Sequence, residues 1–412
     1  MTTSAEPQAI ATTQKTPHLY INTGEVSGDL QGALLIEALR RQAQRRGYAL
    51  NISGMGGVRM EAAGIKLLGN TVAVSSIGIV EALPFIFKAL RLQRQAQSHL
   101  KADPPDLVVL LDYIQPNLVL GRFVRKYFPN VPMVYYIAPQ QWVWEVDPKD
   151  TARVLAVTDK LLAIFPGAAH YYREKGADVS FVGHPLVEQY PDIERRSVAR
   201  QQLGLSDSAT VVTLLPASRA QELKYLMPLL LEAAVSIHGQ LKQQGVEDVT
   251  FLLPVARPDF MDKVAAITQA YDLPLRLLES DPDKIAIAAA DLAITKSGTA
   301  NLEIALMNVP QVVVYRLSRS TAWLIKHVIG YGAAYLSPVN LVEMETIVPE
   351  LVQDEATPER ITAEAMALLQ DDERRQAILS GYQRMRQSLG GPGACDRAAN
   401  EILDLLETKI AV

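Results

Sequence analysis

The chain has 412 residues, of which 49% are hydrophobic and 21% charged, values typical of a soluble globular protein with more than one core. Its net charge of −5 gives no electrostatic reason to expect a nucleic-acid partner. The single cysteine, Cys395, excludes an intramolecular disulfide and a cysteine-rich metal site, and the sequence contains no run of 18 apolar residues that would predict a membrane span.

The chain opens with a predicted β-strand–turn–helix unit. Residues 1–16 are rich in Thr, Ala and Gln, so we expect a disordered tail and not a signal peptide. A strand follows at 19–22, and the turn after it places Ser27, Gly28 and Asp29 where a ligand can approach the backbone. Capping of the next helix by Ser27 or Asp29 explains the same residues. The glycine spacing is not G-x-G-x-x-G, so no nicotinamide cofactor is expected.

Residues 76–94 combine bulky apolar side chains such as Phe87 with the basic residues Lys88, Arg91 and Arg94. This combination is typical of a helix that lies on lipid head groups. A buried amphipathic helix with a solvated basic face explains the pattern equally well.

A continuous apolar run at 106–112 predicts a strand buried on both faces of a parallel sheet. Asp112 falls at its carboxyl end, the edge at which open α/β sheets bind ligands, so it is a candidate general base. The alternative is that Asp112 caps the segment that follows. Further strands are predicted at 134–137, 160–165 and 179–182, and the last of them runs into His184.

Residues 186 to about 207 are charged and irregular, which predicts a connection between two domains. The alternation of strands and helices then resumes with a predicted strand at 210–215. After this strand, Ser218 and Gln221 have the spacing of a capping box. A cap does not explain Arg219, because an arginine in the first helical turn opposes the helix dipole. We therefore assign Arg219 to a phosphate, since charge-assisted hydrogen bonds are worth about 1.5–3 kcal/mol each.

Alternating strands and helices in both halves predict an α/β fold with two Rossmann-like doubly wound domains and a C-terminal helical segment. The motif Asp281-Pro-Asp283 resembles a D-x-D metal site, but Asp followed by Pro is also an ordinary helix start, so no metal is expected. The remaining strands are predicted at 251–255, 275–278, 292–294 and 311–315.

The second candidate site is the turn formed by Ser297, Gly298 and Thr299 between a strand and a helix. N–H groups in the first turn of a helix have no intrahelical partner and lie at the positive end of the dipole, so an anion can bind there. The alternative is that Ser297 or Thr299 only caps the helix.

Seven motifs occur in the order in which they occur in lipid-A-disaccharide synthases, and the chain resembles that family over nearly its whole length after residue 17. The motifs lie at 24–29, 76–81, 182–186, 215–222, 297–303, 348–351 and 393–399. The resemblance implies a glycosyltransferase with two Rossmann-like domains (the GT-B fold), with acceptor binding in 17–188 and UDP-sugar binding in 189–412.

The resemblance also implies the reaction. The family transfers a 2,3-diacylglucosaminyl group from its UDP derivative to the 6-hydroxyl of 2,3-diacylglucosamine 1-phosphate, inverts the anomeric centre and releases UDP. By the resemblance, Asp112 is the base, Arg219 and the Ser297 turn hold the diphosphate, and Glu303 accepts the ribose hydroxyls. His184, Glu222 and Asn340 lie at or near matching motifs and are expected to contact substrate.

Because both substrates carry acyl chains, the resemblance implies a cytoplasmic protein that is peripherally associated with the inner membrane through residues 76–94. No cofactor is implied, and a homodimer stays open. Two other functions stay open as well: a UDP-N-acetylglucosamine 2-epimerase, which shares the fold, and a non-catalytic paralogue that binds UDP-sugar or lipid.

Three positions depart from the family pattern. Trp144 is followed by Glu145 where the family has a basic residue, and the family's Pro-Phe-Glu is here Pro166–Ala168. Glu345 stands where the family carries an arginine, so the charge is reversed. These changes bear on the acceptor and on the acyl pattern of the donor.

Overall fold

The computed structural model describes residues 16–24, 26–72, 83–143, 148–190, 195–216, 220–255, 258–279, 281, 284–316 and 334–410. The chain divides into two compact units. The first comprises Met1–Tyr136, Ala156–Lys160 and Cys395–Val412, and the second comprises Ile137–Leu155 and Leu161–Ala394. Residues 1–15 of the expected tail lie outside the described residues.

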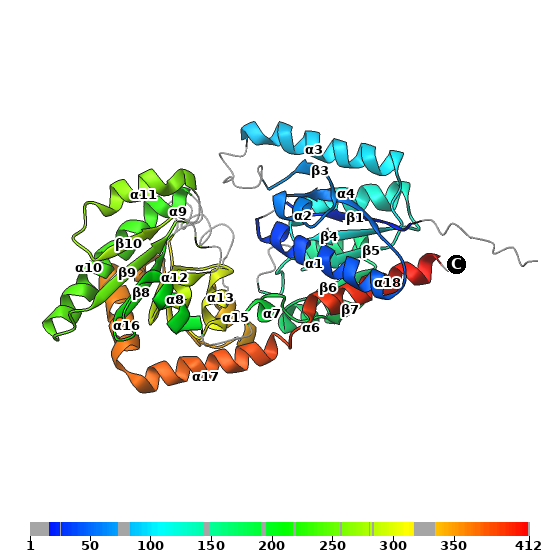
Figure 1. Ribbon diagram of the computed structural model, residues 1–412. Helices are drawn as coiled ribbons and strands as arrows, with labels where there is room; N and C mark the ends of the chain where they lie inside the picture. The colour runs from blue at the N-terminus through cyan, green and yellow to red at the C-terminus, as the bar shows by residue number, and fades with distance from the viewer. Residues whose placement is uncertain are drawn as a thin grey trace, which may run out of the picture. The chain divides into compact units, whose positions relative to one another are not determined.

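The first sheet is parallel, and its five inner strands are almost entirely buried because helices cover both faces (Figure 1). In spatial order its strands are β3 (Lys66–Asn70), β2 (Asn51–Gly56), β1 (His18–Asn22), β4 (Leu107–Leu111), β5 (Met133–Tyr136), β6 (Lys160–Ala163) and β7 (Val179–Phe181). Its helices are α1 (Val26–Arg45), α2 (Val58–Ala62), α3 (Leu83–Ala102), α4 (Ile114–Tyr127), α5 (Pro148–Val157), α6 (Pro166–Glu174) and α7 (Leu186–Gln189).

The second sheet is also parallel. In spatial order its strands are β10 (Leu275–Leu278), β9 (Val249–Pro254), β8 (Thr210–Leu215), β11 (Leu292–Lys296), β12 (Gln311–Tyr315) and β13 (Glu350–Val352). Its helices are α8 (Arg195–Leu203), α9 (Ala220–Tyr225), α10 (Met227–Gln243), η1 (Pro258–Phe260), α11 (Met261–Thr268), α12 (Ile285–Ala288), α13 (Ala300–Leu306), α15 (Pro338–Glu343), η3 (Gln353–Glu355), α16 (Pro358–Gln370) and α17 (Asp372–Ser388).

The two sheets share one winding. In each, the first three strands add in one direction and the next strand adds on the other side of the first, so the order reverses between β1 and β4 and again between β8 and β11. In a doubly wound sheet the crevice at such a reversal, on the carboxyl edge, is where ligands bind. The predicted fold class of two Rossmann-like sheets is therefore confirmed.

The C-terminal helix α18 (Ala394–Ile410) belongs to the first unit, although α17 belongs to the second. Polar contacts attach α18 to α1 and to the loop after it. Arg41 pairs with Asp396 at 2.6 Å, and Arg46 pairs with Asp404 at 2.7 Å. The predicted terminal helical segment is present, and its last helix completes the N-terminal unit.

Two local predictions need correction, and a third is tested only in part. The edge strands β3 and β13 were not predicted, because each is short and only partly buried. Residues 186–207 are not irregular throughout, since α7 and α8 lie there. α3 begins at Leu83 in the described chain, and residues 76–82 of the predicted segment lie outside it.

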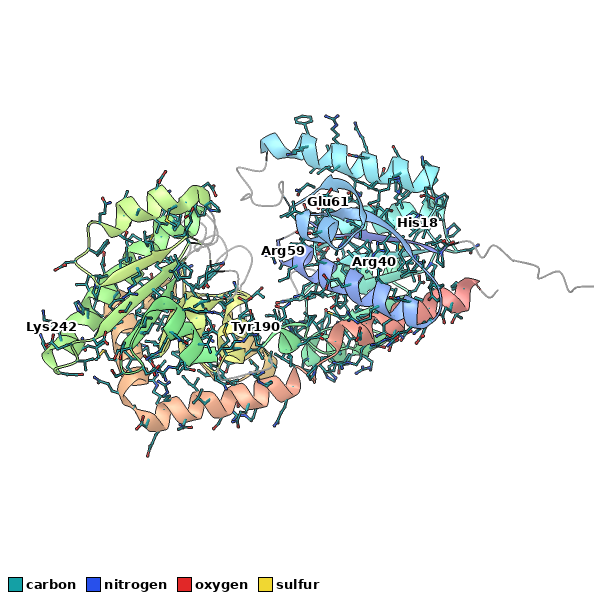
Figure 2. All side chains as sticks on the ribbon, viewed as in Figure 1. His18, Arg40, Arg59, Glu61, Tyr190 and Lys242 are labelled. Carbon is teal, nitrogen blue, oxygen red and sulfur yellow. The ribbon has the colours of Figure 1, made fainter. Side chains whose placement is uncertain are left out.

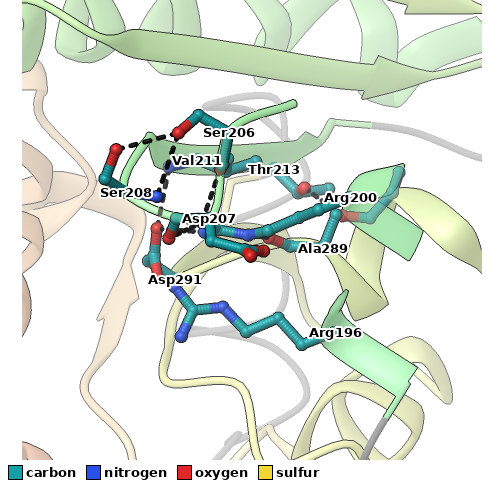
Figure 3. Close-up of polar contacts among 10 residues, drawn as sticks. Arg196, Arg200, Ser206, Asp207, Ser208, Val211, Thr213, Ala289 and Asp291 are labelled. Carbon is teal, nitrogen blue, oxygen red and sulfur yellow. Dashed lines mark hydrogen bonds and ion pairs between the residues drawn. The ribbon is translucent and has the colours of Figure 1, made fainter. Parts of the chain in front are cut away.

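A buried arginine, Arg200, forms hydrogen bonds at the amino edge of the second sheet (Figure 3). Its guanidinium donates to Oδ2 of Asp291 at 2.8 Å and to the carbonyl oxygen of Ala289 at 3.0 Å. Two more carbonyl oxygens, those of Ser206 and Asp207, accept from its Nη1. Because α8 carries charged residues such as Arg200, its sequence predicted a solvated linker. Arg200 is instead buried within the second unit.

Replacing Arg200 by alanine should lower the free energy of unfolding by about 3 kcal/mol, because it removes the buried partner of Asp291. Arg196→Ala is the matched control. Arg196 pairs with the same carboxylate but is 47% exposed, so its removal should cost no more than about 1 kcal/mol. Urea unfolding of both variants measures the difference. Equal losses would contradict the account of Arg200.

Candidate active site

The carboxyl edge of the first sheet brings two of the predicted site residues together. Asp112 follows the end of β4 and is partly exposed. Ser27 lies in the first turn of α1, after β1, and its Oγ donates a long hydrogen bond of 3.5 Å to Oδ2 of Asp112. Because β1 and β4 flank the reversal in strand order, both side chains lie where this fold binds ligands.

The backbone at Asp112 is unusual. Asp112 and Tyr113 are both left-handed, with φ of 49° and 45°. Such a conformation costs about 1–3 kcal/mol for each residue that is not glycine, and it persists only where the surroundings hold it. Tyr113, and not Asp112, occupies the N-cap position of α4, so Asp112 is not the N-cap of this helix.

A buried polar network holds this turn, and its members were not predicted from the sequence. Nδ2 of Asn117 donates to the carbonyl oxygens of Leu111 at 3.1 Å and of Asp112 at 2.5 Å. The Tyr135 hydroxyl donates to the same Asp112 oxygen at 2.8 Å. Oδ1 of Asn117 accepts from Nδ2 of Asn22 at 2.7 Å. The only signal in the sequence was an asparagine one helical turn beyond the candidate base.

Glycines allow the turn after β1 to lie close to this network. A Cβ on Gly24 would lie 2.1 Å from the Tyr113 ring, and one on Gly28 would lie 2.0 Å from Oγ1 of Thr23. Both distances are far below van der Waals contact, so any larger residue would push the turn away from Asp112.

Asp29 is buried, and its carboxylate is already engaged. It accepts hydrogen bonds of 2.8 to 3.1 Å from three backbone N–H groups at the start of α2, those of Gly57, Arg59 and Met60. Asp29 therefore caps α2, a different helix from the one proposed in the capping alternative, and it connects α1 to the loop after β2.

The second candidate site follows β11, at the reversal of the second sheet. The Ser297 hydroxyl donates to the carbonyl oxygen of Leu336 at 2.8 Å, and Thr299 makes no side-chain capping bond. The Gly298 N–H donates to Oδ1 of the buried Asn301 at 2.8 Å. Among the described residues, the N–H groups of Thr299 and Ala300 have no protein acceptor, so these two remain for an anion.

Two charged side chains flank this turn. The Lys296 Nζ lies 3.7 Å from the position that a Cβ on Gly298 would take, so its ammonium adds positive charge beside the turn. Glu303 is buried, accepts from the Tyr190 hydroxyl at 3.2 Å and lies 3.4 Å from Nζ of Lys284. The Glu303 carboxylate is thus held in place before any ligand binds.

Other predicted site residues lie elsewhere or outside the described chain. Ser218 and Arg219 fall outside the described residues, as does the side chain of Glu222. Asn340 is buried, and its amide is saturated within the protein. It donates to the Val348 carbonyl and to Glu350, and accepts from the N–H groups of Ile347 and Val348. In this arrangement Asn340 holds the loop before β13.

His184 is buried beside the Phe165 ring, with the ring centroids 5.1 Å apart. Burial lowers the pKa of His184 to about 3, so the imidazole is neutral near neutral pH. Its Nδ1 accepts from the Leu186 N–H at 3.2 Å, which leaves the proton on Nε2 as a donor.

Residues that could hold a metal lie away from these turns. In the described chain the ligand atoms of His18, His99 and Asp103 lie within 4.8 Å of one another. His18 begins β1 (Figure 2), so this group lies at the amino edge of the sheet, opposite Asp112. Asp281 of the D-x-D motif instead caps α12, accepting from the N–H groups of Ile285 and Ala286.

A pocket of about 430 Å³ in the second unit is also distant from the candidate site. Arg196, Thr210 and Asp291 are among the residues that line it. Thr210 begins β8 and Asp291 precedes β11, so the pocket opens at the amino edge of the sheet. The carboxyl-edge turns remain the candidate active site.

Comparisons with known proteins show the family of the chain. A family model described as lipid-A-disaccharide synthetase matches residues 19–403. A lipid-A-disaccharide synthase of Gloeothece citriformis is 50% identical over 386 residues, covering 94% of this chain and 99% of that protein. One from Synechocystis sp. is 46% identical over 387 residues, covering 94% and 97%.

Solved structures show the fold. The S. aureus MnaA–UDP co-structure superimposes with a TM-score of 0.63 at 15% identity, covering 95% of this chain and 97% of that one. The fold and the family match together define a glycosyltransferase of the two-Rossmann-domain (GT-B) class. Within that class, the chain belongs to the lipid-A-disaccharide synthetase family.

The buried imidazole predicts a pH dependence of stability. The unfolded chain protonates His184 near pH 6.5, whereas the folded chain does so only near pH 3, so stability should fall as pH drops from about 6.5 towards 3. His184→Gln should reduce this slope by up to about 1.4 kcal/mol per pH unit. Urea unfolding at a series of pH values measures it, with the exposed His170→Gln as control. An unchanged slope in His184→Gln would contradict the prediction.

Proposed function

We propose that the protein transfers a 2,3-diacylglucosaminyl group from its UDP derivative to 2,3-diacylglucosamine 1-phosphate, forming the lipid A disaccharide 1-phosphate and UDP. The observation that carries the proposal is the accessible Asp112 carboxylate beside Ser27, at the carboxyl edge where the first sheet reverses. Family membership supports the same reaction.

The chemistry assigned to each sheet follows from its charges. The Asp112 carboxylate accepts the proton of the attacking 6-hydroxyl, whose oxygen bonds to the anomeric carbon as the bond to the β-phosphate oxygen breaks. Such base catalysis contributes about 100- to 10,000-fold. The departing diphosphate meets the free N–H groups of Thr299 and Ala300, the Lys296 ammonium and Arg219.

The remaining predicted residues have supporting roles in this proposal. Glu303 is placed by Tyr190 and Lys284 to accept the ribose hydroxyls, and neutral His184 offers its Nε2 proton to an oxygen of the substrate. Asp29 and Asn340 act through the loops that they hold.

One assay separates this function from the two alternatives. Purified protein is incubated with UDP-2,3-diacylglucosamine and the monosaccharide 1-phosphate, and the products are analysed by mass spectrometry. Disaccharide and UDP support the proposal. Conversion of UDP-N-acetylglucosamine to UDP-N-acetylmannosamine would indicate an epimerase, and tight UDP binding without any product would indicate a non-catalytic paralogue.

Asp112→Asn should keep UDP affinity and lower kcat by about 100-fold or more, because the amide cannot accept the proton. Arg219→Ala is the complementary variant and should weaken UDP binding about tenfold or more through the loss of a charge-assisted bond. Calorimetric titration with UDP and steady-state kinetics measure both effects. A near-normal rate in Asp112→Asn would remove the base role.

We also propose that α3 contacts the membrane surface from which both acylated substrates come. Phe87 is 80% exposed and Leu90 is 48% exposed, and the exposed basic residues Lys88, Arg91 and Arg94 lie beside them on the same helix. Apolar side chains flanked by cations are suited to anionic lipid head groups. In the described part of the chain, every helix is too short or too polar to span a bilayer.

Phe87→Ser should weaken binding to phosphatidylglycerol-containing vesicles severalfold, measured by co-sedimentation, and added salt should weaken binding of the unmodified protein. Met344→Ser is the control. The Met344 side chain is exposed to a similar degree as that of Leu90 on α3, but its neighbours Glu343 and Glu345 are acidic and not basic. Equal binding by both variants would place the lipid contact elsewhere.

A further inference from the structure

We propose that Asn117 is a positioning residue that sets the direction of the Asp112 carboxylate. The inference rests on the proposed role of Asp112 as base and extends it to a side chain that does not touch the substrate. Asn117 is fully buried in the first unit, four residues into α4 from its N-cap Tyr113.

The first argument is the number of bonds that meet at one peptide. The carbonyl oxygen of Asp112 accepts from Asn117 at 2.5 Å and from the Tyr135 hydroxyl at 2.8 Å. The preceding carbonyl, that of Leu111, accepts from Asn117 as well. Two successive peptide planes around Asp112 are therefore fixed, and with them the direction of its Cα–Cβ bond.

The second argument is that this backbone would not hold its conformation unaided. Asp112 and Tyr113 are consecutive left-handed residues, a conformation that side chains other than glycine adopt rarely. An ordinary turn would direct the Asp112 side chain elsewhere, because φ and ψ decide where Cβ points. The network thus stabilises a conformation whose visible result is the carboxylate lying beside Ser27.

The third argument is that Asn117 is itself oriented. Its Oδ1 accepts from Asn22, the last residue of β1, so the amide cannot rotate without losing that bond. This bond connects the end of β1 to α4, and the bond from Asn117 to the Leu111 carbonyl continues it to the end of β4, so the two strands that flank the reversal are joined through Asn117. A relay of two buried amides and one phenol therefore determines where the base lies.

The test is a double-mutant cycle on kcat. Asn117→Ala should lower kcat about 10- to 100-fold while the dissociation constant for UDP stays unchanged, since misplacing a catalytic group affects the chemical step. In an Asp112→Asn background the same substitution should cause little further loss, because there is no base left to misplace. Leu118→Ala, a buried neighbour on α4, controls for loss of stability and should retain kcat per folded molecule.

A milder variant covers the case in which Asn117→Ala does not fold. Tyr135→Phe removes only the second donor to the Asp112 carbonyl and should lower kcat severalfold with UDP affinity unchanged. Normal kcat in both Asn117→Ala and Tyr135→Phe, or a loss that is fully additive with Asp112→Asn, overturns the positioning role alone. A near-normal Asp112→Asn overturns the proposed base, and the inference with it.

Discussion

Parallel strands that end at the carboxyl edge of a sheet leave carbonyl oxygens without partners in the ladder, and both sheets here satisfy them with a buried asparagine. Asn117 donates to the carbonyls of Leu111 and Asp112, and Asn301 donates to that of Lys296. Each asparagine lies in the first turn of the helix that follows the strand at the reversal. Because unpaired buried carbonyls are costly, these amides fix the two turns on which the proposed chemistry depends.

The two turns differ in charge, and this difference supports the roles proposed for them. The turn after β4 presents a carboxylate, whereas the turn after β11 presents free N–H groups and the Lys296 ammonium. A carboxylate can accept a proton, and N–H groups beside an ammonium can stabilise a departing diphosphate, so the two turns suit the two proposed functions.

The sequence predicted the parts that depend on local pattern. The apolar runs of β4, β8 and β12 and the residues at strand ends, such as Asp112 and Ser297, follow from periodicity and from the winding of parallel sheets. It could not reveal contacts between residues far apart in the chain. Asn22 and Asn117 form a hydrogen bond although they are 95 residues apart in the sequence, and Arg200 and Asp291 do so at a separation of 91 residues. In sequence each of these polar residues looks like surface, because burial of a polar group depends on a partner that only the fold supplies.

Two of the three departures from the family pattern fall on described residues, and both are accommodated locally, whereas Glu145 lies outside the described residues. Glu345 forms an ion pair with Arg384, so the reversed charge is matched by a cation on α17 and does not stand against a substrate phosphate alone. In the Pro166–Ala168 segment a Cβ on Gly167 would lie 2.6 Å from the Trp142 ring. The glycine therefore makes room for an indole that also packs 5.9 Å from the Phe165 ring, beside His184. Glu345 and Gly167 are thus each matched by a nearby side chain, the Arg384 guanidinium and the Trp142 indole, so neither departure disturbs the fold around it.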